Sequence, residues 1–158
     1  MSKTTLDFEK PIIELEQKLH ELKKQSEDRH IDLSGEIALM QKANDMTAIA
    51  IQYGLTFLSE GINPASISQK IAAKHAKLGG QHRFASVTFG VASSFPHGSS
   101  QKQILKKGDI VMLDCGCSVG GYESDITRTV VFGPASEKQI KIWELEKRAQ
   151  AAGFAAAK

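Results

Sequence analysis

The chain has 158 residues, of which 41% are hydrophobic and 24% are charged, as in folded globular proteins. Its formal net charge of +2 gives no reason to expect nucleic acid or a membrane as a partner. No stretch approaches the roughly 18 apolar residues of a membrane-spanning helix, and the first ten residues lack the apolar core of a signal peptide. These features predict a cytoplasmic protein.

An amphipathic helix is predicted over residues 8–25. Pro11 suits its first turn, and its apolar seam is formed by Ile12, Leu15, Leu19 and Leu22. A polar connection follows at residues 25–33, which is short enough to join two helices into a hairpin.

Two further helices are predicted before any strand. The first covers residues 34–58, with Ser34 as its cap, and the second opens at Asn63 and covers residues 64–78. His75 lies on the apolar face of the second helix and is interpreted as a packed helix residue. The other residues of this face are Ile67, Ile71 and Leu78.

After Gly80 the pattern changes to the period of two that is typical of strands. Residues 84–89 and 109–113 are predicted strands, separated by a loop. Ser136 and Gln139 form a capping box that starts a last helix. One face of that helix consists of Ile142, Leu145 and Ala149.

Asp114 and Asp125 flank a predicted β-hairpin whose turn contains Gly120 and Gly121. Opposite residues of an antiparallel pair have positions with a constant sum. A two-residue loop at 119–120 or 120–121 makes this sum 239 or 241, and the two aspartate positions add up to 239. Either loop therefore places both carboxylates on one face, directly opposite or one diagonal apart.

Two carboxylates on one face repel each other unless a cation lies between them, so this register favours a metal site. The alternative is a three-residue turn that separates the two side chains and leaves both in solvent. Cys115 and Cys117 would share the face opposite Asp114. We expect reduced thiols there, because a disulfide between next-but-one residues of a strand would be strained.

Five stretches carry a family resemblance: E-I-A-L-M-Q-K-A-N, F-P-H-G, G-D-I-V-M-L-D-C-G, G-Y-E-S-D-I-T-R-T and E-K-R-A-Q. In this order, residues 36–158 resemble the first half of the catalytic domain of Xaa-Pro dipeptidases and aminopeptidases, the pita-bread metallopeptidases. The resemblance implies an α+β fold in which helices pack on an antiparallel sheet of about four strands. It also implies a site for two divalent metals, Mn²⁺, Co²⁺ or Zn²⁺, that hydrolyses X-Pro or N-terminal peptide bonds of a peptide substrate.

The resemblance assigns roles to individual residues. Asp114 matches a ligand of one metal, and Asp125 matches the aspartate that bridges both metals. His97 matches a histidine that positions the peptide or stabilises the tetrahedral intermediate; its alternative interpretation is an ordinary surface-loop histidine. Arg128 is interpreted as structural, with orientation of Asp125 as the alternative.

Three further ligands of the family, a histidine and two glutamates, come from the second half of its domain. This chain has no histidine after His97, and its acids after Asp125 lie in the last helix: Glu137, Glu144 and Glu146. The resemblance therefore implies an incomplete peptidase domain, with weak or absent metal binding and no activity in the isolated chain. The alternatives are a non-catalytic interaction or assembly module, or a recombined chimera without selected activity.

Residues 6–37 fit a different family. The stretches L-D-F-E-K-P-I-I-E-L-E-Q-K-L-H-E-L and I-D-L-S-G-E-I resemble the N-terminal helical segment of the acetyl-coenzyme A carboxylase carboxyltransferase α-subunit. We therefore expect a helical hairpin over residues 1–35 and a half pita-bread domain over residues 36–158. The uncovered apolar face of a half domain predicts self-association.

Overall fold

The computed structural model describes residues 33–96, 98–99 and 101–157. The chain divides into two compact units, Met1–Ile37 and Ala38–Lys158, and nearly all described residues belong to the second. The helix expected at residues 8–25 lies outside the described residues, and the domain boundary after residue 35 stays a prediction. Within the described part of the chain, no helix is long and apolar enough to cross a membrane.

Helix α2 (Ser34–Leu55) buries one stripe of mostly small side chains. The buried residues recur at helical spacing: Ala43, Met46, Thr47, Ala50, Ile51 and Gly54. Gly54 allows a close helix contact, because a Cβ there would lie 2.7 Å from Cγ1 of Ile71. The helix ends before the predicted Leu58, because the amides of residues 56–58 bond carbonyls three residues back and tighten the turn.

Helix α3 (Pro64–Lys77) begins where the sequence predicts. The side chain of Asn63 accepts a hydrogen bond from the Ser66 amide at 3.0 Å, and Pro64 occupies the first helical turn. The buried face of the helix consists of Ile67, Ile71 and His75. The interpretation of His75 as a packed residue is confirmed, since its side chain has no exposed surface.

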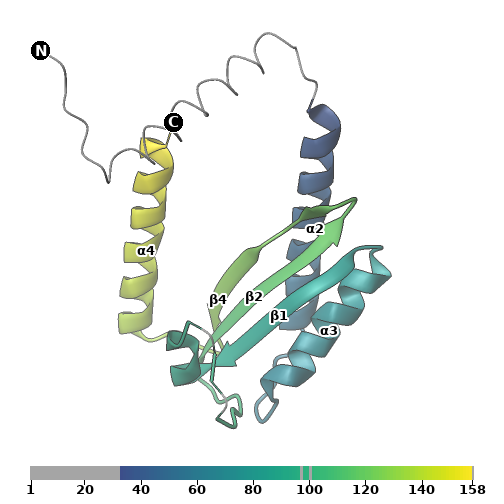
Figure 1. Ribbon diagram of the computed structural model, residues 1–158. Helices are drawn as coiled ribbons and strands as arrows, with labels where there is room; N and C mark the ends of the chain where they lie inside the picture. The colour runs from purple at the N-terminus through teal and green to yellow at the C-terminus, as the bar shows by residue number, and fades with distance from the viewer. Residues whose placement is uncertain (1–32, 97, 100, 158) are drawn as a thin grey trace, which may run out of the picture. The chain divides into compact units, whose positions relative to one another are not determined.

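Four antiparallel strands form one sheet (Figure 1). The strands are β1 (Gln81–Phe89), β2 (Ile110–Val119), β3 (Tyr122–Glu123) and β4 (Ile126–Val131). Strand β2 is central, with β1 along one side and both β3 and β4 along the other. The expected α+β architecture, with helices on an antiparallel sheet, is confirmed.

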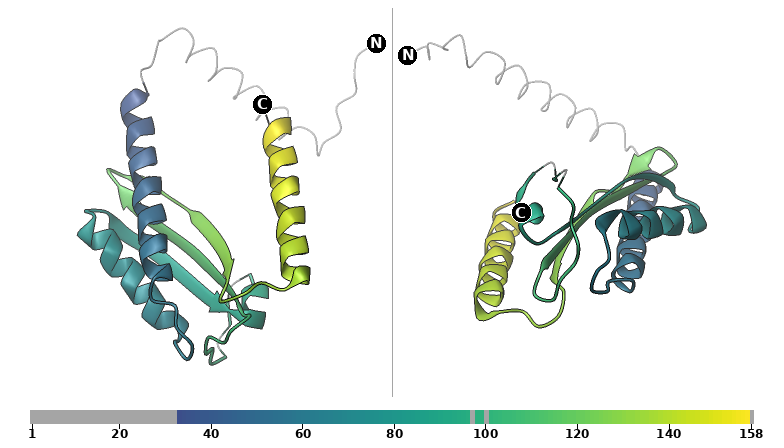
Figure 2. Two further views of the ribbon diagram at one scale, coloured as in Figure 1. Left: turned by 180° about the vertical axis from the view of Figure 1, so that it is seen from behind. Right: turned by 90° about the horizontal axis from the view of Figure 1, so that it is seen from below.

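Helices α2 and α3 cover one face of this sheet (Figure 2). Strand β2 alternates accordingly, and its fully buried side chains toward the helices are Val111, Leu113, Cys115 and Cys117. Both cysteines are free, as predicted. The intervening residues Met112 and Asp114 are half-buried and belong to the opposite face, which the two helices leave open.

Helix α4 (Glu137–Ala156) starts with the predicted capping box. Ser136 and Gln139 exchange side-chain to backbone hydrogen bonds, and Nε2 of the Gln139 side chain also donates to the Gly108 carbonyl at 2.9 Å. No residue of the helix is buried, and Trp143 keeps 56% of its surface exposed. Its apolar side chains therefore remain available for contacts outside the described chain.

Candidate functional site

A two-residue turn at Gly120 and Gly121 joins β2 to β3. Both glycines have positive φ angles, 58° and 88°, as the central residues of a type I′ hairpin turn require. Val119 pairs with Tyr122 across the turn, so the positions of opposite residues add up to 241 along the hairpin. Of the two predicted loops, the chain has the one at 120–121.

This register places Asp114 and Asp125 on the open face of the sheet. Thr127 lies directly opposite Asp114, and Asp125 precedes Thr127 by two residues, so it is one diagonal away from Asp114. The hydroxyl of Thr127 donates a hydrogen bond of 2.8 Å to Oδ1 of Asp114. The prediction that the two carboxylates share one face is confirmed, while their role as metal ligands stays a prediction.

The neighbouring Asp114 affects the charge state of Asp125. Partial desolvation raises the pKa of Asp125, and repulsion by the Asp114 charge and a hydrogen bond to its carboxyl raise it further. A raised pKa means that the folded chain holds this proton more tightly than an isolated aspartate would. A divalent cation would compete with that proton, so its affinity should fall as the pH falls.

Replacing one carboxylate tests this coupling. We expect Asp114→Asn to lower the pKa of Asp125, because the substitution removes the repelling charge. A carboxyl ¹³C NMR titration of Asp125 measures the change. The exposed Asp45 of α2 provides a control, since Asp45→Asn should leave the pKa of Asp125 unchanged. An Asp125 pKa that is the same in Asp114→Asn and in the unmodified chain would contradict the geometry.

Gly116 allows the two strands of the hairpin to approach at the aspartates. A Cβ at this position would clash with the carbonyl oxygen of Ser124 and lie 2.5 Å from Cε1 of Phe84. The residue before Asp125 can therefore lie against β2 only because position 116 has no side chain. Sequence reasoning included Gly116 as the last residue of the stretch G-D-I-V-M-L-D-C-G but gave it no role of its own, although it follows Asp114 by two residues and so shares its face.

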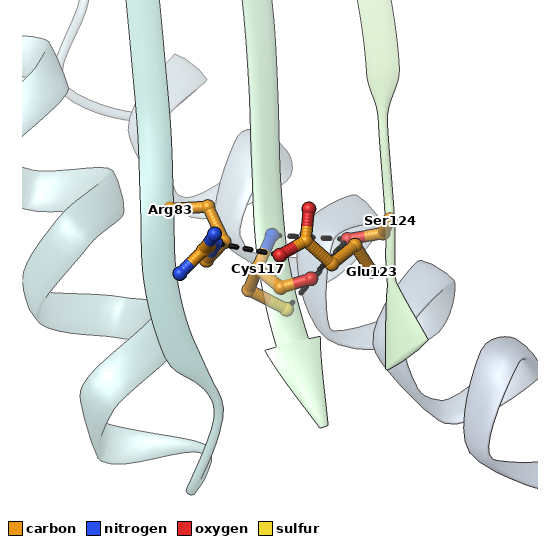
Figure 3. A network of polar contacts seen from close by, with 4 residues as sticks. All are labelled: Arg83, Cys117, Glu123 and Ser124. Atoms are coloured by element: carbon orange, nitrogen blue, oxygen red, sulfur yellow. Dashed lines mark hydrogen bonds and ion pairs between the residues drawn. The ribbon is translucent and has the colours of Figure 1, made fainter. Parts of the chain in front are cut away.

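Ser124, the residue before Asp125 in the chain, anchors the hairpin to β2 (Figure 3). Its hydroxyl accepts a hydrogen bond from the Cys117 amide at 3.0 Å and donates one to the Cys117 carbonyl at 3.1 Å. Thr47 of α2 lies 2.7 Å from the same hydroxyl, which links the hairpin to the helices. Ser124 is 3% exposed, so these bonds form in the protein interior, where leaving the hydroxyl unpaired would be costly.

An ion pair crosses the sheet beside this anchor. Nε of Arg83 in β1 lies 2.7 Å from Oε1 of Glu123 in β3, on either side of β2 (Figure 3). Both side chains are about half exposed, so the pair contributes roughly 1 kcal/mol at most. The buried hydroxyl network, rather than this ion pair, holds Asp125 in place.

Two other predicted residues have different outcomes. His97 lies outside the described residues, so its role near the substrate stays a prediction. Arg128 pairs with Leu113 in the register, which places it on the helix-covered side of the sheet and away from the carboxylates. Its guanidinium donates to the Thr127 carbonyl at 2.8 Å, as the structural interpretation expects.

The two carboxylates suit part of a divalent-metal centre. Carboxylate oxygens are hard ligands, and ions such as Mn²⁺ prefer them. Among the described residues, no group of three or more His, Cys, Asp or Glu side chains is placed to hold a metal. Asp114 and Asp125 therefore fit one side of such a centre and do not complete it.

Comparison with known proteins identifies the family. Residues 38–158 match the model of metallopeptidase family M24. The chain belongs to this family. The resemblance that the motifs indicate is thereby confirmed over nearly the same residues. Residues 5–60 also match a model described as acetyl co-enzyme A carboxylase carboxyltransferase-like, which overlaps the M24 match at residues 38–60 and confirms the second resemblance.

Individual M24 relatives are similar over most of this chain. The putative dipeptidase YkvY of Bacillus subtilis is 35% identical over 132 residues, which are 82% of the chain and 36% of the relative. The Xaa-Pro dipeptidase of Pyrococcus furiosus is 32% identical over 133 residues, which are 82% of the chain and 38% of the relative. The chain thus spans little more than a third of the length of these relatives.

Solved structures agree with the family assignment. Prolidase from Pyrococcus furiosus superposes with a TM-score of 0.69 at 27% identity, covering 82% of this chain and 39% of that one. X-Pro aminopeptidase from Thermotoga maritima superposes with a TM-score of 0.71, covering 82% and 37% respectively. At 23% identity, the second similarity shows the fold alone. The half pita-bread architecture is confirmed by these neighbours.

Proposed function

We propose that residues 38–158 are the carboxylate-bearing segment of a metallopeptidase that hydrolyses X-Pro or other N-terminal peptide bonds. Asp114 and Asp125 would be ligands of a divalent metal, Mn²⁺, Co²⁺ or Zn²⁺, and His97 would contact the peptide substrate. The observation that carries this proposal is the placement of both aspartates one diagonal apart on the open face, within the M24 match. The relatives named as Xaa-Pro dipeptidases support the choice of substrate.

The residues of this chain would orient the metal rather than perform the chemistry themselves. A bound divalent ion supplies Lewis acidity toward the peptide carbonyl. Thr127 holds Oδ1 of Asp114 through its hydroxyl, and the buried Ser124 fixes the backbone beside Asp125. These bonds reduce the freedom of both carboxylates, and preorganised ligands lose less entropy when a metal binds.

We propose further that the isolated chain is inactive. The family resemblance implies five protein ligands for two metals, and the described residues bring only two carboxylates together. The alternative function is a non-catalytic interaction module. One observation favours it: α4 and β4 border an open cavity of about 740 Å³, lined by apolar residues that include Val130, Ile140 and Trp143.

Activity and metal binding test the two parts of this proposal separately. With added Mn²⁺, we expect no hydrolysis of an X-Pro dipeptide above a blank that contains Mn²⁺ alone, because the ligand set is incomplete. We expect weak Mn²⁺ binding, measured by electron paramagnetic resonance, to be lost in Asp125→Ala and retained in Asp45→Asn. Turnover that disappears in Asp125→Ala would contradict the proposed inactivity. Mn²⁺ binding that Asp125→Ala leaves unchanged would contradict the proposed ligands.

Self-association is the partner interaction that we propose for the isolated chain. Ile140 and Trp143 are 47% and 56% exposed on α4, and covering them would remove apolar area from water. At micromolar concentration, light scattering should give a mass above that of the monomer. The double substitution of Ile140→Glu with Trp143→Glu should restore the monomer, whereas Gln150→Glu on the same helix should not. A monomer mass for the unmodified chain would contradict this proposal.

The proposed location is the cytoplasm. Cys115 and Cys117 are both free and buried, and thiols persist in the reducing compartments of the cell. Burial also raises the pKa of the Cys115 thiol to about 12, so that it stays protonated and unreactive.

A further inference from the structure

Strand β1 has a free edge within the described chain. It pairs with β2 on one side, and no other described strand pairs with it. The Phe89 amide points away from β2 and donates to Oε1 of Gln103 at 2.8 Å. In an antiparallel ladder, alternate residues direct their peptide groups to the same side, so those of Ala85 and Val87 also face this edge. The Gln103 side chain thus takes one of the positions that a neighbouring strand would occupy.

A cavity of about 630 Å³ lies along this edge. Its walls are the first turn of α3, residues 85–88 of β1 and residues 101–103 of the following loop. Helix α3 runs beside β1 in Figure 1, with its first turn near the end of the strand. An extended peptide fits such a space between a strand edge and a helix, because it needs the width of only one strand.

Thr88 provides independent evidence that this cavity takes a polar ligand. It lines the cavity and is 3% exposed, and its hydroxyl has no hydrogen-bond partner among the described residues. Buried hydroxyl groups are nearly always paired, and an unpaired one needs an explanation. A ligand that brings a donor or acceptor into the cavity would satisfy it.

The charge at the cavity favours an acidic ligand. Lys102 is the one ionisable side chain among the described lining residues, and no described carboxylate lines the cavity. The first turn of α3 adds the positive end of a helix dipole, which attracts anions. Both contributions favour a carboxylate beside the strand edge.

We propose that this edge binds an extended segment of another protein as an additional strand, with an acidic side chain directed toward Lys102. Its peptide groups pair with those of Ala85 and Val87, and it supplies a hydrogen bond to the Thr88 hydroxyl. A second copy of this chain is a poorer occupant. It would bring its own α3 to the shared edge, where the first α3 already forms a wall. The site uses neither Asp114 nor Asp125, so it extends beyond the proposed peptidase function.

Peptide binding to the full chain tests this proposal. The probe is the blocked pentapeptide acetyl-Thr-Val-Asp-Val-Thr-amide, titrated into ¹⁵N-labelled protein and followed by NMR. We expect the amide signals of Ala85 and Val87 to shift. The same peptide with Asn in place of Asp should bind about tenfold more weakly, because a charge-assisted contact is lost. Shifts confined to the Asp114–Thr127 face, or no shifts at all, would overturn the proposal.

Matched variants separate the contribution of strand pairing to peptide binding from the contribution of the Lys102 charge. Ala85→Pro removes an edge amide at a half-buried position, where an edge strand tolerates proline, and should abolish binding. Lys102→Glu should weaken binding at least about tenfold, since it replaces attraction by repulsion. The control Lys107→Glu changes an exposed lysine outside the cavity lining and should bind as the unmodified chain does. Equal binding by the Lys102 and Lys107 variants would overturn the acidic specificity.

Thr88→Val distinguishes a ligand-binding role of Thr88 from a purely structural one, because the two roles predict different effects on peptide binding. It removes the unpaired hydroxyl at almost constant volume, so the melting temperature of the free chain should rise. The same change should weaken peptide binding, because the ligand loses its partner. A variant that is more stable and binds equally well would show that Thr88 does not contact the ligand. Edge-amide signals that shift with protein concentration alone would instead identify a second copy as the occupant.

Discussion

Gly116→Ala should lower the free energy of unfolding by about 3 kcal/mol, near the upper end for overpacking a single site. Gly116 lies on β2, the central strand of the sheet, and a methyl group added there meets the Ser124 carbonyl and the ring of Phe84 in β1. The backbone near Ser124 cannot retreat easily, because its hydroxyl is bonded to Cys117 and lies beside Thr47. Urea unfolding followed by circular dichroism measures the loss.

A second glycine provides the control for Gly116→Ala. Gly153 lies in α4 with no atom within 4 Å of an added Cβ, so Gly153→Ala should stabilise the helix by up to about 1 kcal/mol. In the Gly116 variant we also expect the pKa of Asp125 to fall, since the clash moves it away from Asp114. A Gly116 variant that unfolds at the same urea concentration as the unmodified chain would contradict this account of Gly116.

The register of the aspartates could be predicted because it depends on few residues. Side chains alternate along a strand, and a two-residue turn fixes the parity of every pair that follows it. The choice between the two loops could also have been made from sequence. Gly120 and Gly121 both have positive φ, and only the loop at 120–121 uses both glycines as its central residues.

The buried polar network could not be predicted in the same way. Thr47 reaches His75 and Ser124, which are 28 and 77 residues away in sequence, and no local spacing indicates such contacts. A β-bulge between His82 and Phe84 also changes the parity of β1. Strict alternation from Phe89 would place His82 on the open face, whereas the bulge places it opposite Cys117 and beside His75.

Acidification should destabilise the chain through His75. Burial lowers the pKa of His75 to about 4, and the neighbouring His82 contributes to this shift. The unfolded chain therefore takes up a proton near pH 6.5, before the folded chain does. The contribution of neutral His75 to the free energy of unfolding is fully present above pH 6.5. It is lost as the pH falls toward 4, by about 1.4 kcal/mol per pH unit and about 3 kcal/mol in total.

The hydrogen bonds of His75 explain why the folded chain resists protonation of its neutral ring. Its Nδ1 lies 2.9 Å from Nδ1 of His82, so one ring must donate and the other accept. Its Nε2 lies 3.2 Å from the Thr47 hydroxyl, which in turn lies beside Ser124. Neutral rings satisfy this chain of bonds, whereas a proton on both Nδ1 atoms would turn the bond between the two histidines into a repulsion.

His75→Gln isolates this effect, because glutamine keeps hydrogen-bonding capacity but does not titrate. The variant loses stability at pH 7, and its unfolding free energy should then vary much less between pH 7 and pH 5 than that of the unmodified chain. The half-buried His82, whose pKa burial also lowers, provides the comparison, and His82→Gln should flatten the curve less. Urea unfolding at several pH values measures both slopes. Parallel curves for His75→Gln and the unmodified chain would show that another group causes the acid sensitivity, since only a proton taken up by unfolded His75 links this residue to pH.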